Sequence, residues 1–174
     1  MTLEALNALD ADMAAGAFLR CCGSSHWATQ LAAARPFASA DAIADTGDAV
    51  WSSLERADWL EAFAAHPQIG SGGSDGSGAP GGSRWSDQEQ AGVGGAAEET
   101  RRRLADANRD YENRFGYIFI VCATGKTADE MLALLERRLR HDAGEELPVA
   151  AEEQRKITRL RLMKLLEQGP DTTS

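Results

Sequence analysis

The sequence lacks the features that define several classes of protein. It has only three cysteines among 174 residues, Cys21, Cys22 and Cys122, and no Cys-x-x-Cys spacing that would suit a zinc site. Its longest unbroken apolar run, residues 117–123, has seven residues, whereas a membrane-spanning helix needs about 20. We therefore expect three reduced thiols, no structural metal and a soluble chain.

Basic residues are also too few for a protein that binds nucleic acid. Lys and Arg number 18 against 27 Asp and Glu, which gives a formal net charge of -9 at pH 7. An acidic chain has no general affinity for phosphate backbones or anionic lipid surfaces. Residues 1–10 have no basic residue ahead of an apolar block, so they do not resemble a secretory signal. We expect a cytoplasmic protein that binds neither nucleic acid nor membrane.

What the sequence does contain is helical periodicity, with apolar residues recurring every three or four positions. The pattern predicts helices over about residues 3–18, from Trp51 towards His66, from Ser86 to Phe115, from Thr127 through Leu139, and from about Ala150, after Pro148, to Leu166. Gly116 is placed to end the third of these with a left-handed cap. The length suits one domain. We predict an all-α, single-domain helical bundle of about six to eight helices covering residues 1–174.

Three segments fall outside this helical pattern. Residues 117–123 are rich in β-branched and aromatic residues, but no second strand-like run offers a partner, so we expect buried extended chain or the start of a helix. Residues 70–82 hold seven glycines in thirteen positions, which predicts a mobile surface loop inside the one domain. The polar residues 169–174 predict a frayed tail.

Gly125-Lys126-Thr127 follows an apolar run, as in a phosphate-binding loop. That cradle requires another glycine five positions before Gly125, where this chain has Ile120. We therefore expect Gly125 to turn the chain and Thr127 to cap the next helix, with Glu130 completing a capping box. Nucleotide binding remains an alternative.

The segment from His66 to Glu89 contains two candidate sites for acid/base chemistry and anion binding. His66 follows a predicted helix and precedes Pro67, and the negative end of the helix dipole favours an imidazolium suited to proton transfer. A plain capping or surface role is the alternative for His66. Ser86 and Glu89 have capping-box spacing, and the same helix N-terminus could hold a polar, partly anionic ligand.

Arg161 is the third candidate. It falls inside the apolar stripe of the last helix, whereas Arg159 points to the opposite side. A buried arginine needs an anionic partner, which could be a protein carboxylate or a ligand. His26 and His141 have no comparable setting, and we expect them to be structural or solvated.

The order of four motifs resembles the OHCU decarboxylase family. The motifs are AHPQIG at 65–70, SDQEQAGV at 86–93, NRDYENRFGYIFIVCATGKT at 108–127 and KITRLRLMKL at 156–165. The resemblance implies an all-α enzyme, usually a homodimer, with no metal or organic cofactor. Such an enzyme decarboxylates 2-oxo-4-hydroxy-4-carboxy-5-ureidoimidazoline (OHCU) to (S)-allantoin in urate breakdown. A non-catalytic helical interaction module is the alternative from another functional class.

The resemblance also implies roles for individual residues. It makes His66 the catalytic acid/base, oriented by Glu89. It places the following residues around the ureide substrate: Pro67, Ser86, Gln90, the backbone of Phe119, Ile120, Val121, Cys122 and Ala123, and Arg161, which should meet a carboxylate or carbonyl of the substrate.

Overall fold

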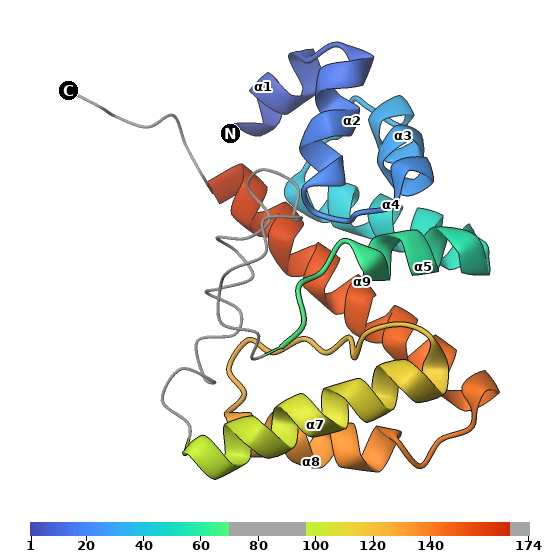
Figure 1. Ribbon diagram of the computed structural model, residues 1–174. Helices are drawn as coiled ribbons and strands as arrows, with labels where there is room; N and C mark the ends of the chain where they lie inside the picture. The colour runs from blue at the N-terminus through green and yellow to red at the C-terminus, as the bar shows by residue number, and fades with distance from the viewer. Residues whose placement is uncertain (70–96, 168–174) are drawn as a thin grey trace. The chain divides into compact units, whose positions relative to one another are not determined.

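The computed structural model describes residues 1–69 and 97–167, and all regular secondary structure in these ranges is helical (Figure 1). The helices are α1 (Leu3–Ala8), α2 (Ala11–Leu19), α3 (Ser25–Ala33), α4 (Ala40–Ser53), α5 (Arg56–Ala64), α7 (Glu98–Phe115), α8 (Ala128–Arg138) and α9 (Ala143–Glu167). The predicted all-α class and helix number are thus confirmed for the described residues. No helix among them is long and apolar enough to cross a membrane.

The chain divides into two compact units. Unit 1 comprises Met1–Ala62 and Arg155–Ser174, and unit 2 comprises Phe63–Gln154. The single domain therefore stays a prediction. The predicted loop at 70–82 and tail at 169–174 lie outside the described residues.

The predicted helix over residues 3–18 is wrong, because the structure has two helices there. The backbone at Leu9 is extended, and the Asp10 carboxylate caps α2 by accepting the Met13 N–H. A short polar side chain that bonds the backbone in this way favours a new helix start over a continuous helix. Met13, expected on the core face, is 61% exposed.

The predicted helix from Trp51 towards His66 is also divided in two. Leu54 is extended at the end of α4, and the Asp58 carboxylate accepts the Glu55 N–H at the start of α5. The apolar spacing runs across this break, so periodicity alone could not reveal it.

Helix α7 ends as predicted but does not begin at Ser86. Gly116 follows its last residue in the left-handed conformation, with φ at 80°, and donates its N–H to the Glu112 carbonyl. Ala97, immediately before α7, has a φ of -58° and a ψ of 146°, which is not helical, so the predicted helix is not continuous up to Phe115. The capping box predicted at Ser86 lies outside the described residues.

Helix α9 begins earlier than predicted. Asp142 and Glu145 each accept the other's backbone N–H, at 2.8 and 3.0 Å, which is a reciprocal capping box ahead of the proline. Pro148 lies inside α9. A proline there removes the one hydrogen bond that would reach the Gly144 carbonyl. The capped first turn starts the helix in spite of that loss.

Unit 1 is built on α2 packed against α3, with α3 also against α4. Phe18 and Trp27 meet edge to face with ring centroids 6.2 Å apart, and both are fully buried. The Trp27 indole N–H donates to the Gly47 carbonyl at 2.9 Å. A Cβ at Gly47 would lie 3.1 Å from the Trp27 ring, so the missing side chain lets α4 approach the indole.

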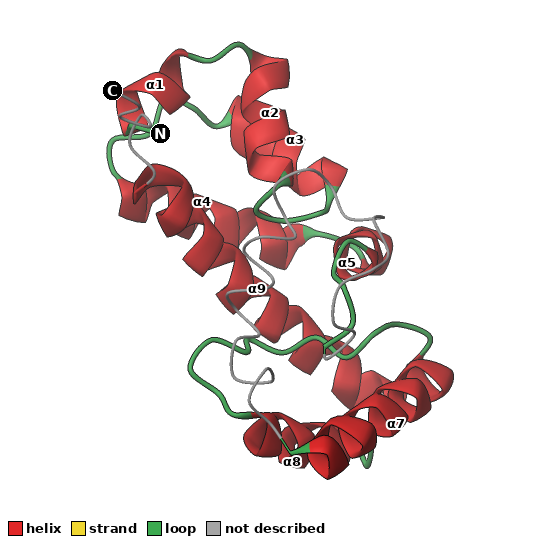
Figure 2. Ribbon diagram, turned by 60° about the vertical axis from the view of Figure 1, so that its left-hand side comes forward, coloured by secondary structure: helices red, strands yellow, loops and turns green. Residues whose placement is uncertain are grey.

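Unit 2 pairs α7 with α8, which lie side by side in Figure 2. Residues 117–123 are neither helix nor strand and are mostly buried, which confirms the predicted buried extended chain. Tyr111 of α7 packs on Phe115 and Phe119, with ring centroids 4.7 and 5.3 Å away. The extended segment is therefore held against α7 by aromatic contacts.

Candidate functional site

The His66–Pro67 turn follows α5 directly and is tied to unit 2. The His66 N–H donates to the Phe63 carbonyl at 3.1 Å, and His66 is half-buried. The Phe63 ring is fully buried and lies 5.3 Å from the Tyr117 ring, measured between centroids. This contact brings the turn that carries His66 to the start of the extended segment.

Helix α7 fixes the residues that follow this turn. The Gln68 side-chain amide donates to the Glu112 carboxylate at 2.6 Å. The Asn108 side-chain amide donates to the Ile69 carbonyl at 3.3 Å, and Asn108 is 4% exposed. The turn around His66 is thus held from α7 on its C-terminal side and by Phe63 on its N-terminal side.

Charged side chains clamp the backbone of the extended segment. Arg138 of α8 donates to the Ile120 carbonyl at 2.6 Å, and Glu153 of α9 accepts the Cys122 N–H at 2.7 Å. The Lys126 ammonium donates to the Cys122 carbonyl at 2.8 Å. Such charge-assisted bonds are stronger than neutral ones, so these peptide groups have defined orientations.

Some backbone groups of this segment have no hydrogen-bond partner among the described residues. They include the N–H of Ile120 and both the N–H and the carbonyl of Val121. Buried backbone groups are normally hydrogen-bonded, and Val121 is only 6% exposed. These groups are therefore among the candidates in the segment for contact with a ligand.

The Gly125-Lys126-Thr127 motif is a turn and a helix cap, as predicted. Gly125 has a φ of 78°, and Thr127 and Glu130 form the reciprocal capping box of α8. Lys126 bonds the preceding backbone with both its N–H and its ammonium group. Its internal bonding argues against a role in holding phosphate.

A buried charge cluster in unit 2 was not predicted. Glu146 of α9 is completely buried and pairs with Arg138 of α8 through Nε, 2.7 Å from its Oε1. The Tyr111 hydroxyl donates to the same Oε1, and His141 Nδ1 lies 2.7 Å from Oε2. Burial, together with the Glu146 carboxylate, raises the pKa of Tyr111 far above its usual value, so Tyr111 remains a donor. His141 is thus structural, as expected.

One sequence signal could have revealed this cluster. Arg138 follows Met131 and Leu135 at the spacing of one helix face, and all three are buried. Arg138, like Arg161, is therefore an arginine within an apolar helix face that needs an anionic partner. Nothing in the spacing identifies Glu146 as the partner, because it lies on the next helix.

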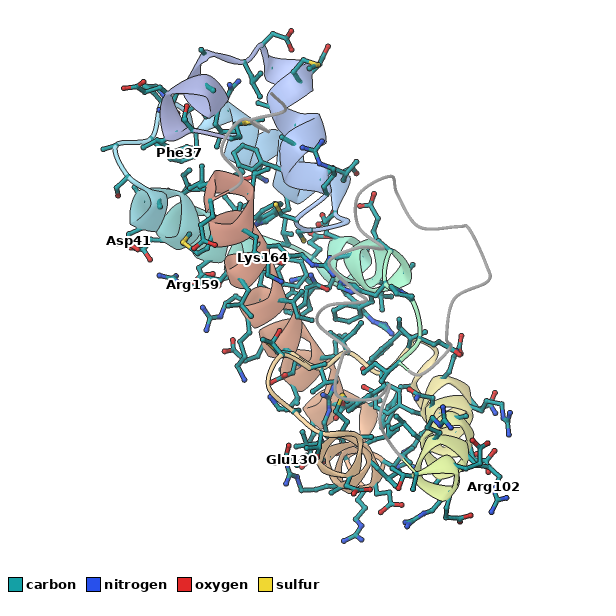
Figure 3. All side chains as sticks on the ribbon, turned by 90° about the vertical axis from the view of Figure 1, so that its left-hand side faces the viewer. Phe37, Asp41, Arg102, Glu130, Arg159 and Lys164 are labelled. Carbon is teal, nitrogen blue, oxygen red and sulfur yellow. The ribbon has the colours of Figure 1, made fainter. Side chains whose placement is uncertain are left out.

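In unit 1, Arg161 and Arg159 lie on opposite sides of α9, as predicted. Arg161 is 5% exposed, in a stripe with Ile157 and Leu165. Arg159 is 39% exposed and donates to Asp45 and Asp48 of α4 at 3.2 and 2.9 Å. Figure 3 shows Arg159 pointing outward from α9 beside α4.

Two cysteines share the interior of unit 1 with Arg161. Burial raises the pKa of the Cys21 thiol to about 12 and that of Cys22 to about 11, while the Arg161 charge acts in the opposite direction. All three cysteines are thiols, as predicted. In the described part of the chain no group of three or more His, Cys, Asp or Glu could hold a metal ion.

The structure places the remaining candidates as follows. His66, Pro67 and residues 119–123 belong to unit 2, and Arg161 belongs to unit 1. Ser86, Glu89 and Gln90 lie outside the described residues. His26 is solvated, as expected, with 56% of its side chain exposed and Asp58 3.4 Å away.

Comparison with known proteins gives a consistent result along the chain. A uric acid degradation bifunctional protein of Arabidopsis thaliana is 39% identical to this chain over 145 residues, which are 83% of this chain and 45% of that protein. The chain therefore spans less than half of this relative. The OHCU decarboxylase of Haloferax volcanii is 30% identical over 165 residues, 93% of this chain and 94% of that enzyme.

Solved structures and a family model agree with these relatives. A crystal structure of an OHCU decarboxylase, obtained in the presence of (S)-allantoin, has a TM-score of 0.75 and 36% identity, covering 88% of this chain and 99% of that one. An (S)-allantoin synthase structure, 19% identical with a TM-score of 0.69, shares the fold. The model of the OHCU decarboxylase family matches residues 7–163. The chain belongs to the OHCU decarboxylase family.

Proposed function

We propose that this chain is a cofactor-independent decarboxylase that converts OHCU to (S)-allantoin and CO2 in urate degradation. The observation that carries the proposal is the match along nearly the whole length of a decarboxylase solved with (S)-allantoin. The substrate is a small ureide carrying a carboxylate.

His66 acts as the general acid/base of this reaction. Loss of CO2 leaves an electron pair that must be delocalised over the ring and then protonated on one face. A positioned imidazole can supply that proton, and Glu89 keeps it oriented. The anchoring of the His66 turn by Phe63 and Gln68 supports a fixed position for the imidazole.

The extended segment binds the ring and ureido group through its backbone. Val121 has an N–H and a carbonyl with no hydrogen-bond partner among the described residues. These groups offer one donor and one acceptor, which match the carbonyl and N–H groups of a ureide. Phe119 is buried beside them, and an apolar wall favours loss of a charged carboxylate. The other binding residues that we propose are Pro67, Ser86, Gln90 and Arg161.

Circular dichroism during OHCU decay tests the proposed activity. OHCU is generated in place from urate by urate oxidase and hydroxyisourate hydrolase, with and without this protein. Uncatalysed decay gives racemic allantoin, so we expect a faster signal that ends in optically active (S)-allantoin. Slow decay to a racemic product, with folded protein present, would refute the activity.

His66→Ala tests the acid/base role. General acid/base groups contribute about 10²–10⁴-fold, so we expect turnover to fall by that order and stereochemical control to weaken. The same assay on the purified variant, with far-UV circular dichroism as a folding control, measures both. Near-native turnover with retained optical activity would remove His66 from this role.

Arg161→Ala and Arg159→Ala form a matched pair on one helix. We expect the first to lower kcat/KM far more than the second, because Arg159 has surface aspartates as partners. Thermal unfolding of both variants separates lost binding from lost stability. Equal effects on kcat/KM would contradict the assignment of Arg161 to substrate binding.

The proposal also includes a homodimer and a cytoplasmic location. The family resemblance supports the dimer, and the acidic composition is compatible with a cytoplasmic enzyme. Light scattering on the purified chain measures the first, and a fluorescent fusion in the native cell measures the second.

A further inference from the structure

Arg138 and Glu146 form a pair whose burial requires an explanation. The two side chains are 4% and 0% exposed, with Nη2 of Arg138 2.5 Å from Oε1 of Glu146. Removing both charges from water is costly, and apolar residues of similar volume are often as stabilising or more so. A gain in stability is therefore a weak explanation for burying this pair. The other hydrogen bonds that Arg138 donates indicate what else the pair does.

One of those donors reaches the extended segment. Nη1 of Arg138 donates to the Ile120 carbonyl at 2.6 Å. Ile120 and Val121 are joined by a trans peptide, in which the carbonyl and the N–H point in opposite directions. Arg138 thus fixes the plane of this peptide and directs the Val121 N–H away from itself. A hydrogen bond to the carbonyl also polarises the peptide and strengthens that N–H as a donor.

The rest of the cluster immobilises Arg138. Its Nε and Nη2 are held by Glu146, and Nη2 lies 3.3 Å from the Tyr111 hydroxyl. The guanidinium carbon lies 4.6 Å from the centre of the Phe119 ring, within range of a cation–π contact. His141 occupies the other Glu146 oxygen and is 31% exposed. These contacts hold the guanidinium in one orientation, in which Nη1 points towards the Ile120 carbonyl.

We propose that Arg138, held by Glu146 and Tyr111, is a positioning residue that orients the Ile120–Val121 peptide towards the substrate. This rests on the proposed function, since that function makes residues 119–123 the substrate contact. Arg138 itself touches no substrate and acts through the peptide. It contributes to ureide binding only by fixing the orientation of the Val121 N–H.

Arg138→Lys separates charge from position. A lysine retains a cation for Glu146, but its single nitrogen cannot reproduce the planar fork that also reaches Ile120. Arg137→Lys is the matched control, because Arg137 is the preceding residue of α8 and is exposed. Hydrogen exchange of peptides covering 117–123, in the absence of ligand, tests the anchor. We expect faster exchange in Arg138→Lys and no change in Arg137→Lys.

Steady-state kinetics on OHCU test the consequence for binding. We expect KM to rise at least about tenfold with kcat changed much less, since small displacements of positioning groups can cost up to about a hundredfold. A merely structural defect would lower the active fraction, and hence the apparent kcat, at unchanged KM. Unchanged exchange, or a kcat loss without a KM change, would overturn the proposal.

The double variant Arg138→Met with Glu146→Gln covers the case in which Arg138→Lys folds poorly. It removes both charges together while keeping similar volumes, so a stable fold is expected. KM should remain raised in this stable protein, because the donor to Ile120 is still missing. Recovery of native KM together with stability would show a structural role only. If the wild type itself is inactive but exchange still rises in the variants, the proposed function fails. Arg138 would then still anchor the Ile120–Val121 peptide, but its role in substrate binding would be refuted.

Discussion

Arginine–carboxylate pairs join helices in both units, but at opposite degrees of exposure. In unit 1, Arg155 and Arg159 of α9 share Asp48 of α4, and these three side chains are between 25% and 39% exposed. In unit 2, Arg138 and Glu146 are almost completely enclosed. The same two types of residue therefore make a surface contact in one unit and an interior one in the other.

The difference lies in what each arrangement can do. Exposed pairs have mobile side chains and are screened by salt, so they add little stability and fix little geometry. An enclosed pair must have its hydrogen bonds satisfied, and the Glu146 oxygens meet Arg138, Tyr111 and His141. In unit 2 the enclosed pair thus holds Arg138 in one position beside residues 119–123. The exposed pairs of unit 1 fix no side chain in this way.

Breaking the enclosed pair should have the largest effect on stability. Glu146→Ala leaves the Arg138 charge buried without its carboxylate, and such a loss costs about 3–5 kcal/mol. Urea unfolding followed by circular dichroism measures the change in the free energy of unfolding. A loss below about 1 kcal/mol, as for an exposed pair, would mean that water reaches Arg138 and that the contrast between the units is wrong.

Breaking the exposed pairs should have a smaller effect. Asp48→Ala removes the carboxylate shared by Arg155 and Arg159, and exposed pairs contribute about 0.2–1 kcal/mol each. We expect a loss of no more than about 2 kcal/mol in the same unfolding experiment. In 1 M NaCl most of that loss should disappear, because the charges are screened. A loss as large as that of Glu146→Ala, or one insensitive to salt, would contradict this.

The rates at which the cysteines are alkylated provide a comparison of the interiors of the two units. This is the smallest of the expected effects, because no residue is replaced. Because burial raises the pKa of Cys21 and Cys22 from 9.0 to about 12 and about 11, both stay protonated at pH 8 and gain reactivity only well above pH 9. The half-buried Cys122 should react first with iodoacetamide. Mass spectrometry of labelled peptides, before and after addition of urea, checks this order. Equal labelling of all three in the native protein would show that unit 1 opens readily.

Helix ends were predictable where a residue acts through local backbone chemistry. Gly116 and the Thr127–Glu130 box lie where their spacing placed them, because left-handed glycine and reciprocal capping need only neighbours within four residues. The breaks at Asp10 and Asp58 depend on equally local bonds, but a strong apolar period ran across them. At Pro148 the proline favours a later helix start, whereas the Asp142–Glu145 capping box upstream of it starts α9 earlier.

The candidate site was predictable only in part, for a related reason. The opposite settings of Arg159 and Arg161 follow from helix geometry alone. The pairing of Arg138 with Glu146 depends on how α8 and α9 meet across a turn, which no residue spacing encodes. The bond from Arg138 to the Ile120 carbonyl is a tertiary contact between a helix and irregular chain, and no residue spacing predicts it.

The way the two units are assembled from the chain has a consequence for synthesis on the ribosome. Unit 2 is one continuous stretch, Phe63–Gln154, whereas unit 1 joins Met1–Ala62 to Arg155–Ser174. The contacts of Asp48 with Arg155 and Arg159 close loops of more than 100 residues, and closing such loops is entropically costly and slow. Unit 2 can therefore fold first during synthesis. The core of unit 1 can form only after the end of α9 has left the ribosome, although its N-terminal helices are made first.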